Sequence, residues 1–153
     1  MSLHEDETIL VKIAGWFHDS GFAQTYSGHE EASMKIAHQF LSSVGMDTTQ
    51  IEIVLSCIEA TKMPQKPKNE LDAIICDADV MHLTSDDFFY KNLLLRCEWE
   101  QICKEKYTDK EWYELNLKFL TDHQFKSYYG KEILQPKLNR NIERMKTLVS
   151  YAK

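Results

Sequence analysis

The stretch Ala14-Gly15-Trp16-Phe17-His18-Asp19-Ser20-Gly21 ends the first of several segments in which apolar residues recur at intervals of three and four. This spacing predicts a helix over residues 6–19, with one apolar stripe formed by Ile9, Ile13, Trp16 and Phe17. An aspartate at the C-terminus of a helix faces the negative end of the helix dipole, at a cost of roughly 0.3–1 kcal/mol. Because Asp19 also follows a Trp-Phe pair that we expect to be buried, its carboxylate needs a cation or strong hydrogen-bond donors nearby.

The same spacing continues along the rest of the chain, and no segment alternates at period two for long. It predicts further helices over residues 29–44, 49–62, 69–83, 88–106, 110–123 and 131–151, the last interrupted near Pro136. Pro64 and Pro67 predict an irregular loop between the third and fourth helices. With no internal repeat and no Gly/Ser-rich linker, the sequence predicts one all-α domain over residues 1–153, a bundle of six to seven helices.

Composition excludes several classes of protein. Hydrophobic residues make up 43% of the 153 residues and charged residues 27%, which excludes a disordered chain and allows a real core. The net charge of −6 argues against a nucleic-acid-binding face. No apolar run approaches the ~18–20 residues that span a bilayer, and the N-terminus does not resemble a signal peptide. We therefore expect a cytoplasmic protein that binds neither nucleic acid nor membrane, with reduced thiols at Cys57, Cys76, Cys97 and Cys103.

A second stretch, Ile74-Ile75-Cys76-Asp77-Ala78-Asp79-Val80-Met81-His82-Leu83, places two aspartates in an apolar helical run. Asp79 shares a helix face with Ile75 and Leu83, so we expect its carboxylate to point inward, one turn from His82. A buried unpaired carboxylate costs several kcal/mol or becomes protonated. A divalent ion would remove that cost, because oxygen and imidazole ligands suit such ions. Hydrogen-bonded structural carboxylates are the alternative.

A third stretch, Gly28-His29-Glu30-Glu31, begins the second predicted helix. Acidic residues in a first turn are ordinary partners of the helix dipole, and a single histidine is usually a polar surface residue. The stretch is therefore uninformative by itself. The ordered combination of His18-Asp19, His29-Glu30 and Asp77-Ala78-Asp79 is far more specific than any one of its parts.

In that order the three stretches resemble the HD-domain superfamily of metal-dependent phosphohydrolases. The likeness extends over roughly residues 7–100 and is greatest to a group in which Trp-Phe-His-Asp and Asp-Ala-Asp with a following histidine recur. The resemblance implies that His18, Asp19 and Asp79 hold one divalent ion, of which Mn, Mg, Zn, Fe, Co and Ni are candidates. It also implies supporting roles beside these ligands for Asp77 and His82.

The resemblance further implies hydrolysis of a nucleotide or other small phosphoester by metal-activated attack of water on phosphorus. Asp79 and His29 would be the catalytic residues, and His29 would contact the phosphate, act as a general acid or serve a second metal. Lys62 would bind the substrate, within a basic loop that also holds Lys66 and Lys68. Three solvated lysines beside two prolines are the alternative interpretation of that loop.

The chain departs from the family pattern at its start. Members of the family carry a further metal-binding histidine on a preceding helix, whereas His4 is the only histidine before His18. Fourteen helical residues separate those two by about 21 Å, so they cannot share an ion. Met-Ser-Leu at the start also resembles a cloning leader. We therefore expect a fragment of a longer protein that lacks its first helix and holds metal weakly or not at all.

Loss of a covering helix would leave apolar surface around Ile9, Ile13 and Trp16, which favours a homo-oligomer formed through the N-terminal region. Two further functions stay open at this point. One is a non-catalytic HD-like helical module that binds a nucleotide or a protein partner, and the other is a purely structural helical interaction domain.

Overall fold

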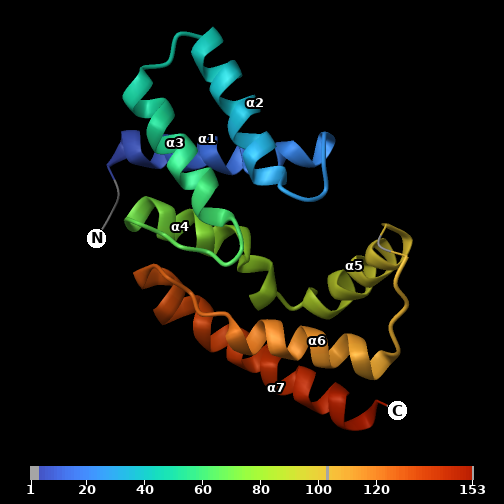
Figure 1. The fold of residues 1–153 in the computed structure, drawn as a ribbon. Helices are drawn as coiled ribbons and strands as arrows, with labels where there is room; N and C mark the ends of the chain where they lie inside the picture. Colours follow the sequence, from blue (N-terminus) through green and yellow to red (C-terminus); the bar gives the residue numbers. More distant parts are fainter. Residues whose placement is uncertain (1–3, 103, 153) are drawn as a thin grey trace. The chain divides into compact units, whose positions relative to one another are not determined.

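The apolar spacing of the sequence produces helices in every segment where it was found (Figure 1). The structure is a computed structural model that describes residues 4–102 and 104–152. Within these ranges it contains seven α-helices and no β-strand, which confirms the prediction of an all-α fold with six to seven helices. The chain divides into two compact units, Met1–Asp79 and Val80–Lys153.

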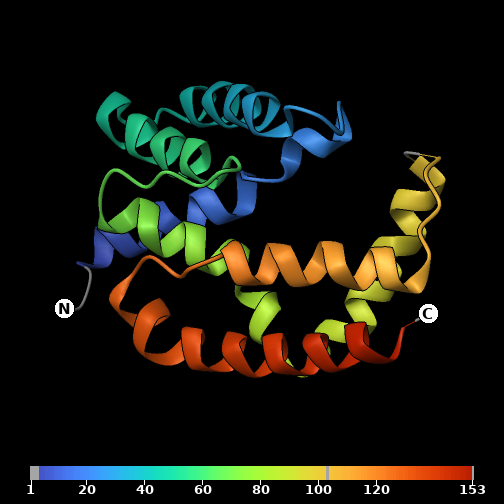
Figure 2. The ribbon, with the colours of Figure 1, turned by 60° about the horizontal axis from the view of Figure 1, so that its bottom comes forward.

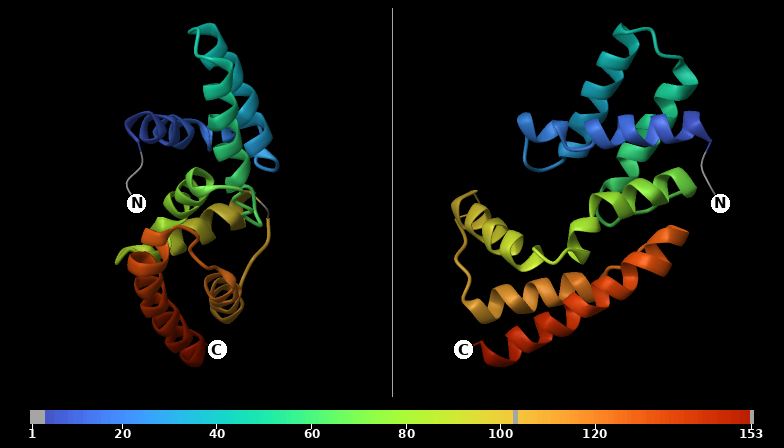
Figure 3. Two further views of the ribbon diagram at one scale, coloured as in Figure 1. Left: turned by 90° about the vertical axis from the view of Figure 1, so that its left-hand side faces the viewer. Right: turned by 180° about the vertical axis from the view of Figure 1, so that it is seen from behind.

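Residues 4–79 of the first unit form four α-helices and one 3₁₀ turn: α1 (Glu5–Phe17), η1 (Ser20–Ala23), α2 (His29–Ser43), α3 (Thr48–Thr61) and α4 (Glu70–Asp79). Helices α2 and α3 lie side by side as a hairpin, and α1 lies across them, as the front and rear views show (Figures 1 and 3). Helix α4 packs against both α1 and α3. The N-terminal end of α3 is capped by Asp47, whose carboxylate accepts a hydrogen bond from the N–H of Thr49 at 2.9 Å.

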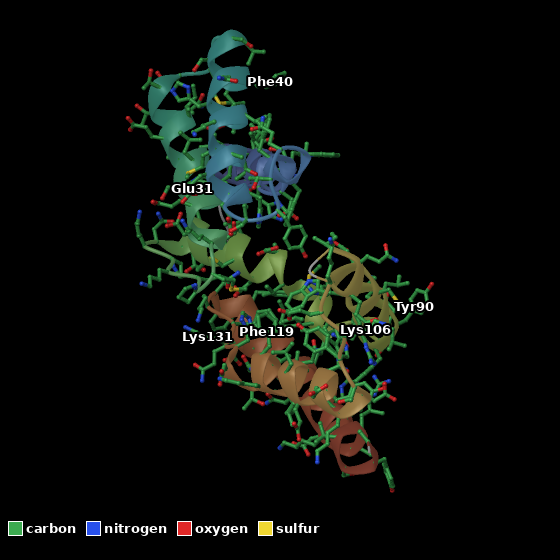
Figure 4. All side chains as sticks on the ribbon, turned by 45° about the vertical axis from the view of Figure 1, so that its right-hand side comes forward. Glu31, Phe40, Tyr90, Lys106, Phe119 and Lys131 are labelled. Carbon is green, nitrogen blue, oxygen red and sulfur yellow. The ribbon has the colours of Figure 1, made fainter. Side chains whose placement is uncertain are left out.

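The core of the first unit joins these helices through mostly aliphatic side chains: Leu10, Ala14, Ala37, Leu41, Ile51, Val54, Cys57, Ile58 and Ile75. Phe17 packs against this core. Its ring centroid lies 5.6 Å from that of Phe40, which Figure 4 labels on α2. The expectation that Trp16 is buried with Phe17 is wrong, because its side chain is 86% exposed. Leu10 and Ala14, one helical turn apart, face the core of the unit. Trp16 lies about 200° around the helix from Ala14 and therefore faces away from the core.

Two helix ends differ from the sequence prediction. Helix α4 ends at Asp79, and the chain continues as the 3₁₀ turn η2 (Met81–Thr84), because Val80 adopts φ −96° and ψ 10°, outside the α-helical region. Helix α5 (Phe88–Ile102) is shorter than predicted, and residues 104–107 after it are irregular.

The second unit contains η2, α5, α6 (Asp109–Asp122), a π-helical segment η3 (Gly130–Leu134) and α7 (Gln135–Tyr151). Helices α6 and α7 lie side by side (Figure 2). The interruption predicted near Pro136 is the change from π to α geometry, with the proline in the first turn of α7, where its missing N–H is tolerated. The core of this unit comprises Val80, Leu83, Phe88, Leu120, Phe125, Leu134, Leu138 and Met145.

Three polar side chains are buried together between α5 and α6 of the second unit, and we call them the Asn92 network. Asn92 Nδ2 donates to Asn116 Oδ1 at 2.6 Å, and Trp112 Nε1 donates to Asn92 Oδ1 at 2.7 Å. Asn116 Nδ2 in turn donates to the carbonyl of Trp112 at 2.8 Å. Each of these groups is neutral, so burial costs little once the hydrogen bonds are made.

Three of the four cysteines lie in the described part of the chain, and all three are free thiols. Cys57 and Cys76 are buried and Cys97 is exposed, whereas Cys103 lies outside the described residues. Burial, together with the nearby Asp72 carboxylate, raises the pKa of the Cys57 thiol to about 12. Across residues 4–102 and 104–152, none of the helices combines the length and the apolar character needed to traverse a lipid bilayer.

Candidate functional site

His18 lies at the C-terminal end of α1 with its ring fixed from one side. Its Nδ1 lies 2.8 Å from the carbonyl of Gly15, and because a carbonyl only accepts, Nδ1 carries the hydrogen. The other nitrogen, Nε2, therefore faces two carboxylates, Asp19 Oδ2 at 3.3 Å and Asp79 Oδ1 at 3.4 Å. The contact with Asp79, then the Gly15 carbonyl and the Asp19 charge, raise the pKa of His18 to about 9 against the opposing effect of burial.

Packing of α1 on α4 brings these three residues together, although sixty positions separate Asp19 from Asp79 in the sequence. Asp19 comes directly after His18, just before η1, and Asp79 is the last residue of α4. Their carboxylates are only partly shielded, with side-chain exposures of 54% and 24% respectively. The candidate ligands named from the sequence are therefore neighbours at one place in the first unit.

His29, the first residue of α2, belongs to the same group. Its Nε2 lies 3.5 Å from Asp19 Oδ1, and its Nδ1 lies 3.6 Å from Glu30 Oε2. The ring stacks on Phe22, with ring centroids 3.7 Å apart and planes inclined by 17°. We call His18, Asp19, His29 and Asp79 the His18 cluster.

A glycine sets the distance between η1 and α2 and hence the position of His29. Gly21 donates its N–H to Ser33 Oγ at 2.8 Å. A Cβ atom at Gly21 would lie 1.9 Å from the carbonyl oxygen of His29, which no side chain could tolerate. Only glycine therefore allows η1 to lie against the first turn of α2, with Asp19 and Phe22 beside His29.

The donor types of the His18 cluster fit a divalent metal ion. Two ligands about 2.1 Å from a tetrahedral ion lie about 3.4 Å apart, and the Nε2 atom of His18 is 3.3 and 3.4 Å from its two carboxylate oxygens. A metal-binding histidine usually donates a hydrogen bond from its other ring nitrogen, as His18 Nδ1 does to the carbonyl of Gly15. Over the described ranges, however, no set of three or more His, Cys, Asp or Glu side chains is already arranged to hold an ion. His18 Nε2 instead lies between the two carboxylates, and these contacts favour the protonated imidazole.

The two supporting residues named from the sequence are Asp77, on α4, and His82, which follows that helix. Asp77 is buried, with 3% exposure, and it is two residues from Asp79, so it projects from a different face of α4. His82 lies exposed in η2, in the second unit. Helix α4 ends at Asp79, so His82 follows it in the turn η2 and not in the same helix.

The basic loop is largely neutralised. Lys62 forms an ion pair with Glu31, which Figure 4 labels on α2, and this pair raises the pKa of the lysine and lowers that of the glutamate. Lys68 forms a second ion pair with Glu59 at 2.6 Å. In the described part of the chain no carboxylate lies within ion-pair distance of Lys66, so this lysine keeps an uncompensated charge. All three lysines line one shallow pocket of about 300 Å³.

Two polar residues on or against α4 do not stand out in the sequence. Gln65 Nε2 donates to the Cys76 carbonyl at 3.1 Å and to Asp79 Oδ2 at 3.5 Å. Nothing in the spacing of the loop sequence connects Gln65 to α4. Asp72 is fully buried and accepts from Ser56 Oγ at 3.3 Å. The argument applied to Asp79, an aspartate among inward-facing apolar residues, could have found Asp72 as a structural carboxylate.

Comparison with known proteins assigns no family to the chain. No family model, no curated protein and no solved structure matched it. The functional argument therefore rests on the chemistry of the His18 cluster.

Proposed function

We propose that the chain is a metal-dependent phosphohydrolase of the HD type that acts on a nucleotide or another small phosphoester. The observation that supports the proposal most is the environment of His18. Its Nε2 faces carboxylates from two elements that are distant in the sequence, and its Nδ1 is tied to a backbone carbonyl. A histidine held in this way is oriented as a metal ligand.

The charge balance of the cluster supports the same proposal. Asp19 and Asp79 share one imidazole, and Glu30 adds a third carboxylate beside His29. Carboxylates thus outnumber the imidazole rings that can carry a positive charge. Such an acidic excess attracts a divalent cation.

The residues around the cluster would divide the work of hydrolysis. A divalent ion held by His18, Asp19 and Asp79 would supply an activated water and polarise a phosphoryl oxygen. His29, whose ring stacks on Phe22, would contact the phosphate or give a proton to the leaving oxygen. Lys62 would bind the substrate by exchanging Glu31 for a phosphate, and Asp77 and His82 would have secondary roles.

The test is hydrolysis of nucleotides and nitrophenyl phosphates with Mn²⁺, Mg²⁺, Zn²⁺, Co²⁺ or Ni²⁺ added. Because three protein ligands hold an ion weakly, we expect turnover only with an excess of added metal and none with EDTA. Asp79→Ala should lower turnover and metal affinity by at least roughly 100-fold, because the ligand is lost. The matched control is Asp86→Ala, at an exposed aspartate in the second unit, which should change neither.

Undiminished turnover and metal affinity in Asp79→Ala would refute the role of Asp79. Nucleotide binding without turnover, whichever metal is added, would instead favour the non-catalytic module.

A further inference from the structure

The loop between α3 and α4, residues 62–69, is attached to α4 by hydrogen bonds from both of its halves. The N–H of Lys68 donates to Asp72 Oδ2 at 3.0 Å, and the side chain of Gln65 donates to the Cys76 carbonyl at 3.1 Å. Two residues of the loop are prolines, which have no N–H group to donate. Its position on α4 therefore depends strongly on the Gln65 side chain.

The amide group of Gln65 has one favourable orientation. Its Nε2 lies 3.1 Å from the carbonyl oxygen of Cys76 and 3.5 Å from Asp79 Oδ2, and both of these are acceptors. An amide rotated by 180° would place Oε1 against two acceptors and lose both contacts. The NH₂ group of Gln65 therefore faces Asp79 and connects the loop to the His18 cluster.

Gln65 and His18 hold opposite oxygens of the same carboxylate. Asp79 Oδ1 lies 3.4 Å from His18 Nε2, and Asp79 Oδ2 lies 3.5 Å from Gln65 Nε2. Contacts on both oxygens restrict rotation of the carboxylate about its side-chain bond. Because an amide is neutral, Gln65 does this without cancelling the negative charge of Asp79, as a lysine would.

The remaining atom of the amide has no evident structural purpose. Gln65 Oε1 is buried and has no hydrogen-bond partner. A buried acceptor without a partner opposes folding, and an apolar side chain of the same length would fill the space without that penalty. The hydrogen bond to the Cys76 carbonyl anchors the loop, and the contact with Asp79 is additional to that anchor.

We propose that Gln65 is a positioning residue that orients the Asp79 carboxylate toward the divalent ion. The inference rests on the proposed metal site, and it assigns the loop before α4 a part in metal binding. Hydrogen bonds to ligating carboxylates change metal affinity by roughly 10–100-fold when they are removed. Gln65 acts through Asp79 and not through the substrate.

Titration of the full chain with Mn²⁺ alone, followed by water-proton relaxation, tests the inference without substrate. Gln65→Met keeps the length of the side chain and removes the donor, and it should weaken Mn²⁺ binding roughly 10-fold or more. Gln50→Met is the matched control, because Gln50 is exposed on α3, and it should bind Mn²⁺ as the parent chain does.

A second variant, Gln65→Lys, keeps the donor to both partners and tests whether the amide must be neutral. An ammonium group can donate to both Cys76 and Asp79, so the loop stays attached, while its charge compensates that of Asp79. We expect this variant to keep the parent thermal midpoint and still to bind Mn²⁺ more weakly.

Equal Mn²⁺ affinity in the parent, Gln65→Met and Gln65→Lys chains would overturn the inference and leave the metal site standing. Absence of Mn²⁺ binding to the parent chain is a different result, because it would overturn the proposed metal site and this inference with it.

Discussion

The His18 cluster of the first unit and the Asn92 network of the second differ in every property that separates a reactive site from a structural one. The Asn92 network is neutral and buried, and its hydrogen bonds measure 2.6–2.8 Å. The His18 cluster is charged and partly exposed, and its contacts measure 3.3–3.5 Å. In the Asn92 network each side-chain donor and acceptor atom has one hydrogen-bond partner. In the His18 cluster, by contrast, His18 Nε2 lies beside two carboxylates.

The difference teaches which kind of polar group needs a function to explain it. In a closed neutral network, the internal hydrogen bonds offset the free-energy cost of burying the polar groups. The His18 cluster and the adjacent Glu30 hold three carboxylates against two imidazole rings, so negative charges remain that repel one another. The second arrangement gains most from an added cation, and this comparison is the reason to look for function in the first unit.

The largest loss of stability should come from Gly21→Ala, in the first unit. The added Cβ would collide with the carbonyl of His29, so η1 must move away from α2, at a cost of roughly 3 kcal/mol. Urea denaturation followed by circular dichroism measures the loss. The His29 ring should also lose the NMR shift caused by Phe22, while the Asn92 network stays intact.

Gly15→Ala is the matched control for Gly21→Ala. Nothing lies within 4 Å of a Cβ at Gly15, which is an exposed position inside α1. This substitution should stabilise the chain by about 0.5–1 kcal/mol through helix propensity. Equal losses in both variants would show that close approach at Gly21 is not what places His29.

A smaller loss should follow from opening the Asn92 network. Asn116→Ala removes the acceptor of Asn92 Nδ2 and leaves that donor buried, which costs about 1–3 kcal/mol. Urea denaturation followed by circular dichroism detects it, and Mn²⁺ affinity should not change. Asn139→Ala, at an exposed position of α7, is the control. A change in Mn²⁺ affinity with unchanged stability would contradict the division between the two clusters.

The protonation of His18 should give a modest dependence of stability on pH. The pKa of His18 in the folded chain is about 9, above its ordinary 6.5. A raised pKa of this kind stabilises the fold fully below pH 6.5, and the contribution is lost as the pH rises through about 9. In EDTA, urea midpoints should fall over this interval in the parent chain and less in His18→Gln. Parallel pH profiles for the two chains would show that His18 is not paired with the carboxylates.

The smallest effect on stability should come from Lys62→Gln. The ion pair with Glu31 lies on the surface, where such pairs contribute little to folding. The thermal midpoint should be nearly unchanged. If Lys62 binds the substrate, KM should rise while kcat stays near the parent value. Unchanged KM would leave Lys62 with the ion pair as its one role, and Lys12→Gln on α1 controls for the change of net charge.

Much of the fold could be predicted from the sequence because apolar periodicity reports helices directly. The predictions that failed depend on features that periodicity does not carry. Large apolar residues dominate the pattern and predict Trp16 in the core, whereas the small Ala14 is the residue that packs there. The extent of α4 was overestimated because the φ and ψ angles of Val80 leave no trace in the residue type.

The candidate site could be predicted in part from the sequence, for a different reason. Asp19 and Asp79 are conspicuous because a carboxylate in an apolar setting is costly, and the structure places both beside His18. Gln65 could not be predicted from the sequence, since burying a neutral amide costs less free energy than burying a carboxylate and a glutamine in a loop does not stand out. Its contact with Asp79 depends on how the loop lies on α4, which is a property of the folded chain.

The close approach at Gly21 also limits how this sequence can change over evolutionary time. Every other residue type carries a Cβ, so each missense change in the glycine codon introduces the same collision with the carbonyl of His29. Neighbouring side chains cannot relieve it, because the obstructing atom belongs to the backbone. Position 21 is therefore closed to neutral drift unless η1 and the first turn of α2 move apart together, and lineages that lose the glycine should lose the present setting of His29 with it.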